Sequence, residues 1–284
     1  MTIRDLFSPL ASSRTLGRVG LYALGVGAYA ALPVWKEKSA YRDFADLDPS
    51  FHAVLAVLLG WLLVFRINTA YGRWWEARTL WGSLVNTSRI LAAKIAHLVR
   101  LTPALQDECQ RLIIAFPYAL RDHLRDESCV SRLPGFADCT DEADHLPGLI
   151  VSKLYEVLYQ AKSHQLVDGD ELRVIDEELR NSLLVCGGCE RIYRTRMIRS
   201  YKLFARQCIA LFLVTYPWAV CHQFGAWTIP LTTVVSYFMI GLETVAEHVE
   251  EPFGRDDDDL DLDGLCTTIE RTVQQIMAAP HQVV

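Results

Sequence analysis

The sequence predicts an all-α, four-span integral membrane protein, and two features carry that prediction. The first is a set of long stretches without Asp, Glu, Lys or Arg, in a chain of 284 residues that is about 29% charged elsewhere. The second is apolar spacing of three and four residues in the charged parts, without the alternation typical of strands. The charge-free stretches are Val19–Trp35 and Pro49–Phe65, of 17 residues each, and Gln207–Leu242, of 36 residues.

The first stretch has two interpretations. At 17 residues it is close to the minimum for one helical crossing, about 17 to 20 residues. Arg14 and Arg18 precede it and Ala28-Tyr29-Ala30 resembles a cleavage site, as in a signal peptide. The later apolar stretches favour a retained crossing.

The third stretch, of 36 residues, is too long for one crossing. Gly225 and Pro230 lie near its middle and predict a helical hairpin, with one arm over about 204–221 and the other over about 227–242. Together with the first two stretches, the hairpin gives four crossings.

Basic residues flank the second and third crossings on one side of the membrane, and such residues favour the cytoplasm. Four crossings then place both termini and residues 67–200 in the cytoplasm of a multi-pass cell-membrane protein. The expected regions are 1–66 with the first two crossings, 67–202 as a cytoplasmic helical region, 203–245 as the hairpin, and 246–284 as an acidic segment and cytoplasmic tail. The flanking basic residues are Arg66, Arg73, Arg78, Arg191, Arg194, Arg196, Arg199, Lys202 and Arg206.

The cytoplasmic region is predicted to consist of amphipathic helices. Residues 126–148 contain two Pro and two Gly without periodicity, which predicts a loop or a helix break. Asp168 or Asp170 is positioned to cap the last helix. The predicted helices are Trp74–Arg100, Pro103–Arg125, Ile150–Ser163 and Glu171–Leu184.

Enzyme and nucleic-acid functions are not supported. The sequence lacks the common nucleophile, phosphate-binding, dinucleotide-binding and zinc-protease motifs, and its net charge is -6. Cys186-Gly-Gly-Cys189 has the CxxC spacing, but no second CxxC or paired histidines accompany it. A helix contact through small residues is therefore favoured over a zinc or redox site, and His145 is expected to be a solvated loop residue.

The segment after the last crossing is strongly acidic. Between Glu243 and Asp263 there are ten acidic residues and one base, Arg255. The four consecutive aspartates Asp256–Asp259 repel one another unless water or a hard cation such as Ca²⁺ neutralises them, and both interpretations stay open.

The acidic segment also matches the EF-hand pattern from Asp259 to Gly264, followed by Glu270. An EF-hand needs an entering helix, and Glu251–Gly254 is a poor helix sequence. We therefore do not expect an EF-hand.

Val57, Trp61 and Phe65 recur every four residues in the second charge-free stretch, so they share one face of the helix. In an isolated membrane helix such a face meets lipid or a neighbouring helix. In a symmetric oligomer it forms stacked apolar rings, a constriction that gates by dewetting.

Three segments resemble those of the bestrophin family in its short bacterial form: RWWEARTLWGSLVN (Arg73–Asn86), GGCERI (Gly187–Ile192) and EPFGRDDDDLDLD (Glu251–Asp263). They occur in the family's order and spacing relative to four membrane segments, and the resemblance covers nearly the whole chain. It implies an all-helical homopentameric ion channel. The second helix of each subunit would line one central pore above a wide cytoplasmic vestibule.

The resemblance also implies roles for particular residues. Val57, Trp61 and Phe65 match the three positions of the family's hydrophobic neck, where Trp61 replaces the usual Ile or Phe. A second, cytoplasmic constriction of the family would be supplied by Ile175 or Leu172.

The calcium clasp of animal bestrophins matches Glu251, through its carbonyl, and the side chains of Asp256 and Asp259. The chain keeps the aspartates but has Glu251 where those members have Asn. Some bacterial members lack the site, so Ca²⁺ as a cofactor is an open expectation.

The predicted function is passive conduction of small monovalent ions by a homopentamer in the lipid bilayer. Chloride-type anions are slightly favoured because animal and plant members imply chloride. One alternative is a cation-selective channel, as in some bacterial relatives. The other is a non-conducting membrane scaffold or assembly factor that uses the acidic segment to bind a partner.

Overall fold

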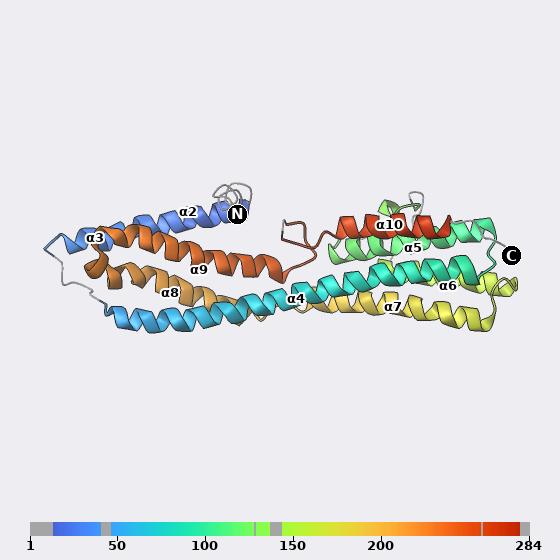
Figure 1. Ribbon diagram of the computed structural model, residues 1–284, viewed down its shortest axis with the longest axis horizontal. Helices are drawn as coiled ribbons and strands as arrows, with labels where there is room; N and C mark the ends of the chain where they lie inside the picture. Colours follow the sequence, from blue (N-terminus) through green and yellow to red (C-terminus); the bar gives the residue numbers. More distant parts are fainter. Residues whose placement is uncertain (1–13, 41–46, 128, 137–143, 257, 279–284) are drawn as a thin grey trace. The chain divides into compact units, whose positions relative to one another are not determined.

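The computed structural model describes residues 14–40, 47–127, 129–136, 144–256 and 258–278. This described part contains helices, turns and no strand, which confirms the all-α prediction. It divides into two compact units (Figure 1). The first unit comprises Met1–Arg73, Arg196–Glu250 and Asp256–Asp258, and the second comprises Trp74–Thr195, Glu251–Arg255 and Asp259–Val284.

The first unit is a bundle of apolar helices. In it α2 packs along α9, and α8 packs against α9 (Figure 1). Leu59 and Leu63 of α4 form a small core with residues of α8. The helices of this unit are α2 (Arg14–Tyr29), α3 (Ala31–Glu37), the beginning of α4 (Pro49–Leu98), α8 (Arg199–Phe224), the 3₁₀ turn η2 (Gly225–Trp227) and α9 (Thr228–Glu250).

The first charge-free stretch is not one helix, contrary to the expectation of an unbroken crossing. It is divided into α2, of 16 residues, and α3, of 7 residues. Pro33 explains the break, because proline has no N–H to donate and its ring clashes with the carbonyl four residues earlier, that of Tyr29. The packing of α2 on α9 supports a retained segment over a cleaved signal peptide.

The predicted hairpin is confirmed. The 3₁₀ turn Gly225–Trp227 separates α8 from α9, and Gly225 has a φ of 53°, which glycine adopts at little cost. Pro230 lies in the first turn of α9, where no helical N–H is needed. Two helical stretches, Pro49–Leu98 and Arg199–Glu250, are long and apolar enough to cross a membrane.

Helix α4 is continuous over 50 residues and contributes to both units. It joins the predicted second crossing to the predicted helix that begins at Trp74. The helix continues past Phe65 without a break, and Asn68, Thr69 and Gly72 all lie inside it.

The second unit is a bundle around one large hydrophobic core to which Trp81, Leu112, Ile150 and Leu179 contribute. Asp168 caps α7 through a capping box with Glu171, as predicted. The elements are the second part of α4, α5 (Pro103–Leu124), the 3₁₀ turn η1 (Val130–Arg132), α6 (Leu146–Ser163), α7 (Gly169–Arg194) and α10 (Leu262–Met277).

Candidate functional site

The candidate site is the face of α4 that carries Val57, Trp61 and Phe65. These side chains are 61%, 68% and 62% exposed in the single chain. On the opposite side of the helix, Leu59 and Leu63 are buried against α8. The helix therefore presents a charge-free apolar face that no other part of the described chain covers.

Arg66 fixes the rotation of α4 directly after Phe65. It is fully buried, and its Nε lies 3.0 Å from an oxygen of Glu243 while its Nη1 lies 3.2 Å from an oxygen of Glu250. Nη1 also contacts the sulfur of Met197. Because a buried charge needs its partners, this cluster holds one side of α4 inward and turns Phe65 outward.

Two basic residues of α8 complete this cluster. Arg206 pairs with Glu243 at 3.1 Å, and Lys202 pairs with Glu250 at 3.1 Å. Glu247 also pairs with both of these bases, so three acids meet three bases near the ends of the apolar stretches. From the sequence, Arg66, Lys202 and Arg206 indicated only which side of the membrane is cytoplasmic. Glu243, directly after the 36-residue charge-free run, could have indicated a buried ion pair with one of them.

The exposed residues of α4 change character after Phe65. Val54, Val57, Leu58 and Trp61 are exposed and apolar, whereas the exposed residues that follow alternate polar side chains with larger ones such as Tyr71 and Trp75. The acid among them pairs with Arg191 of α7. The polar residues exposed between Asn68 and Asn86 are Asn68, Thr69, Glu76, Arg78, Thr79, Ser83 and Asn86.

The second predicted constriction needs a correction. Ile175 is 0% exposed and lies in the core of the second unit, so it cannot narrow a water-filled passage. Leu172 is partly buried against the same core. The exposed apolar residue in that turn of α7 is Val174, at 39%.

The acidic segment folds as a turn closed by the N–H of Leu260, which donates to the carbonyl of Pro252 at 3.0 Å. Arg125 donates to the carbonyls of Phe253 and Gly254. A Cβ added to Gly254 would lie 2.5 Å from a carboxylate oxygen of Asp259, so glycine makes room for that carboxylate.

The calcium ligand set predicted from the resemblance fits in part. Asp256 is exposed and Asp259 is half-buried, and carboxylate oxygens are ligands of the kind that a hard cation prefers. Glu251 is also exposed. Within the described residues, however, no group of three His, Cys, Asp or Glu side chains gathers in the acidic segment within reach of one ion.

The EF-hand pattern does not form an EF-hand, as expected. Helix α10 begins at Leu262, the fourth position of the pattern, so Asp263 and Gly264 are already helical, whereas a calcium loop requires a sharp turn at that glycine. Asp261 instead caps α10 by accepting a hydrogen bond from the N–H of Gly264 at 2.8 Å.

The CxxC sequence lies inside α7, with Cys186 and Cys189 both buried. Burial, with a contribution from Glu190, raises the pKa of Cys186 to about 12, and burial raises the pKa of Cys189 as well. Both thiols are therefore protonated at neutral pH and poorly nucleophilic. A Cβ on Gly188 would lie 2.9 Å from a methyl carbon of Leu80, so the small residue permits the predicted helix contact with α4.

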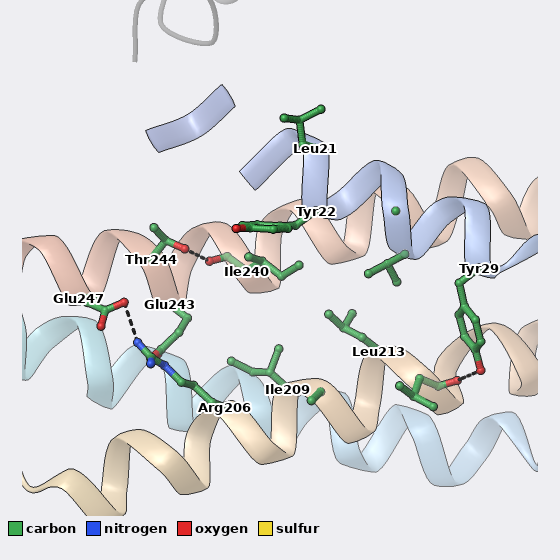
Figure 2. Close-up of a pocket in the computed structure, with 14 residues that line it drawn as sticks. Leu21, Tyr22, Tyr29, Arg206, Ile209, Leu213, Ile240, Glu243, Thr244 and Glu247 are labelled. Carbon is green, nitrogen blue, oxygen red and sulfur yellow. Dashed lines mark hydrogen bonds and ion pairs between the residues drawn. The ribbon is translucent and has the colours of Figure 1, made fainter. Parts of the chain in front are cut away.

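A groove of about 720 Å³ lies in the first unit between α2, α8 and α9 (Figure 2). Its walls are largely apolar and include Leu21, Ile209 and Leu213. At one end Arg206 pairs with Glu247 at 2.6 Å. Its charged groups thus pair with each other, and its walls are of the kind that lipid or protein covers in a membrane.

The family model for bacterial and fungal bestrophin proteins matches residues 3–275. The chain is a member of the bestrophin family. This confirms the resemblance read from Arg73–Asn86, Gly187–Ile192 and Glu251–Asp263, and with it the prediction that the chain is not an enzyme.

Curated relatives of this bestrophin cover most of its length. The voltage-dependent anion channel-forming protein alr2987 of Nostoc sp. is 33% identical over 237 residues, which is 80% of this chain and 77% of the relative. The voltage-dependent anion channel-forming protein mll4386 of Mesorhizobium japonicum is 31% identical over 267 residues, or 92% of this chain and 84% of the relative.

Solved bestrophin structures share the fold. A crystal structure of a point variant of a bacterial bestrophin homologue from Klebsiella pneumoniae superposes with a TM-score of 0.85. The match covers 93% of this chain and 98% of the other, at 22% sequence identity. At that identity the likeness establishes the fold and no more.

Proposed function

We propose that this bestrophin is a homopentameric anion channel whose pore neck is formed by Val57, Trp61 and Phe65 of five copies of α4. The observation that carries the proposal is the exposure of these three side chains on a helix whose other face is held inward by Arg66. The relatives named as anion channel-forming proteins, at 33% and 31% identity, support the same function.

The geometry suggests how the neck controls conduction. Rings of Val57, Trp61 and Phe65 cannot replace the water around an ion, so a narrow neck excludes both water and ions until it widens. Below the neck, the polar residues of α4 that begin with Asn68 can hydrate an ion again. We propose that Val174, with Leu172 beside it, supplies the cytoplasmic constriction in place of the buried Ile175.

Trp61 favours anions over cations when the edge of its ring faces the pore axis. The indole Nε1–H can only donate a hydrogen bond, and aromatic ring edges are partly positive. Aromatic faces would attract cations instead, so the orientation of the rings decides the sign. A cation-selective channel is the competing outcome.

In this proposal the protein crosses the cell membrane four times, with both termini in the cytoplasm. The crossings are α2 with α3, the apolar part of α4, α8 and α9. The break at Pro33 then lies within the first crossing, where neighbouring helices satisfy the backbone.

Calcium at Glu251, Asp256 and Asp259 remains part of the proposal. If the acidic segment binds Ca²⁺, then 1 mM CaCl₂, as a probe in excess of the site, raises the Tm of the purified protein. The double variant Asp256→Ala with Asp259→Ala removes that rise. A Ca²⁺-induced rise that survives in the double variant places the ion elsewhere.

Ion flux tests the function. The full chain is reconstituted into liposomes, and chloride-driven flux is compared for wild type, Trp61→Ala and Phe65→Ala. Both variants widen an apolar neck, so each should raise flux about tenfold, the change expected when a barrier falls by ~1.4 kcal/mol. Leu24→Ala on α2 is the control, because Leu24 is equally exposed and lies off α4.

The negative outcomes are specific. No flux from wild type or either neck variant, together with particles that lack fivefold symmetry, contradicts the channel and supports a membrane scaffold. Flux that is the same in both neck variants and in wild type removes Trp61 and Phe65 from the pore neck.

A further inference from the structure

A cluster of metal-binding side chains lies in the second unit, away from the face of α4 that carries the neck. The Nε2 atoms of His123 and His145 lie 2.7 Å and 3.1 Å from one oxygen of Glu190. The donor atoms of these three residues all lie within 4.8 Å of one another. Cys186 adds a sulfur 3.9 Å from Nε2 of His145.

Three helices bring these donors together. His123 lies in the last turn of α5, and His145 is the N-cap of α6. Glu190 and Cys186 are four residues apart on α7, so they share one face of that helix. The positions are far apart in sequence, which is why the sequence shows no ligand spacing.

The donor set selects the kind of metal. Two imidazoles, a carboxylate and a thiol suit Zn²⁺, whereas Ca²⁺ takes oxygen ligands. In a tetrahedral zinc site, neighbouring donor atoms lie about 3.3–3.6 Å apart. The separations of 2.7, 3.1 and 3.9 Å bracket that range, so small side-chain movements suffice.

One hydrogen bond must change when a metal binds. Nδ1 of His145 accepts from the N–H of Gly148 at 2.9 Å, so the proton of the neutral ring is on Nε2. To ligate through Nε2, the ring must carry its proton on Nδ1 and give up this cap. The loss of one cap is small against ligation by four groups, and the exposed N–H of Gly148 can bind water.

We propose that His123, His145, Glu190 and Cys186 bind one Zn²⁺ per chain and thereby tie α5, α6 and α7 together. Cys186 contributes as a thiolate, because bound zinc displaces the proton of a coordinating thiol. Cys189, the second cysteine of the CxxC sequence, takes no part. His145 is half-exposed and gives the ion an entry path.

Zinc titration of the full-length protein in detergent, after EDTA treatment and dialysis, tests the proposal. We expect about one bound Zn²⁺ per chain by elemental analysis and a rise in Tm of ~5 °C or more with excess ZnCl₂. His123→Ala, Glu190→Gln and Cys186→Ser should each weaken zinc binding at least tenfold.

Two control variants separate this site from other zinc-binding groups. His164→Ala removes an exposed histidine at the end of α6, and Asp256→Ala with Asp259→Ala removes the acidic segment's carboxylates. Both should bind zinc as wild type does. Equal binding by wild type and Glu190→Gln, or loss of binding in either control, overturns the assignment.

Cobalt gives a readout that does not depend on how stable the alanine variants are. Wild-type protein loaded with CoCl₂ should show a near-ultraviolet thiolate-to-metal absorption band together with strong visible bands of tetrahedral Co²⁺. Cys186→Ser should lose the near-ultraviolet band. Wild-type protein without such a band contradicts the four-ligand site, in which case the two histidines only hydrogen-bond Glu190.

Discussion

Trp61 is the residue where this bestrophin departs most from the pattern expected for the neck. Trp61→Phe keeps an aromatic ring and removes the only N–H donor of that side chain. If the indole N–H contacts a passing anion, the anion-to-cation permeability ratio falls about tenfold or more, since hydrogen bonds to charged groups are worth about 1.5–3 kcal/mol. The reversal potential in asymmetric NaCl measures the ratio, and an unchanged value removes Trp61 from selectivity.

Arg66 has a structural role at the same scale. Arg66→Met leaves Glu243 and Glu250 buried with only Arg206 and Lys202 as counter-charges, and breaking a buried pair costs about 3–5 kcal/mol. The remaining bases put the expected loss at the lower end, ~3 kcal/mol. Thermal unfolding in detergent measures it, with exposed Arg199→Met as the control. Equal stability of the two variants contradicts this role.

The shared apolar face of α4 could be predicted from the sequence because a helical period needs only the residues themselves. Val57, Trp61 and Phe65 share a face at any rotation of the helix. The rotation itself is set by contacts of Arg66 with residues far along the chain, at 243 and 250. Those contacts, and the approach of His123 to Glu190, depend on tertiary packing that no local pattern encodes.

At the scale of elements, α2 and α9 are held close by small residues. A Cβ added to Gly27 would lie 2.0 Å from Oγ1 of Thr233, whose hydroxyl donates to the carbonyl of Ile229. Gly27→Ala therefore forces the helices apart, which costs about 1–3 kcal/mol. Gly25→Ala is the matched control, because its Cβ meets nothing within 4 Å. Equal Tm values for the two variants contradict the close contact.

Helix α10 contacts α5 through ion pairs as well as through the packing of its apolar face. Asp263 lies 2.6 Å from Arg121 and 3.1 Å from Arg125. Burial raises the pKa of Asp263, but the two guanidinium groups outweigh it and hold the pKa below its ordinary value. This carboxylate therefore stabilises the fold fully above about pH 4, and the stabilisation is lost as the pH falls through the lowered pKa.

The variant Asp263→Asn tests this contact. It should lower stability at pH 7 by less than ~1 kcal/mol, because the side chain is largely exposed to solvent. The difference from wild type should shrink on acidification below about pH 4. Exposed Asp107→Asn serves as the control in thermal unfolding at both pH values. A difference that does not depend on pH contradicts the ionic contribution.

Most elements could be predicted from the sequence, and each exception has a local cause. Pro33 divides the first charge-free stretch into α2 and α3, because its ring clashes with the preceding turn of the helix. Helix α10 was not predicted, because the aspartates directly before it dominate the composition of this segment. Its buried residues Cys266, Ile269 and Val273 nevertheless follow helical spacing. Ile175, predicted to supply a second constriction, lies on the buried face of α7.

At the scale of the whole molecule, the exposed apolar surface of the first unit determines what the protein can be. Trp35, Trp61, Phe65 and Trp227 are all more than half exposed in the single chain. Such surface is stable only against lipid or other protein, so the chain requires a membrane, further copies of itself, or both. The proposed pentamer uses both, with lipid outside and the α4 face around the axis.

The most direct test is a single-particle structure of the detergent-extracted protein. The account predicts a fivefold particle in which Val57, Trp61 and Phe65 of every subunit face the axis and form its narrowest apolar segment. A particle without fivefold symmetry, or a fivefold particle in which these side chains face the detergent, would contradict it.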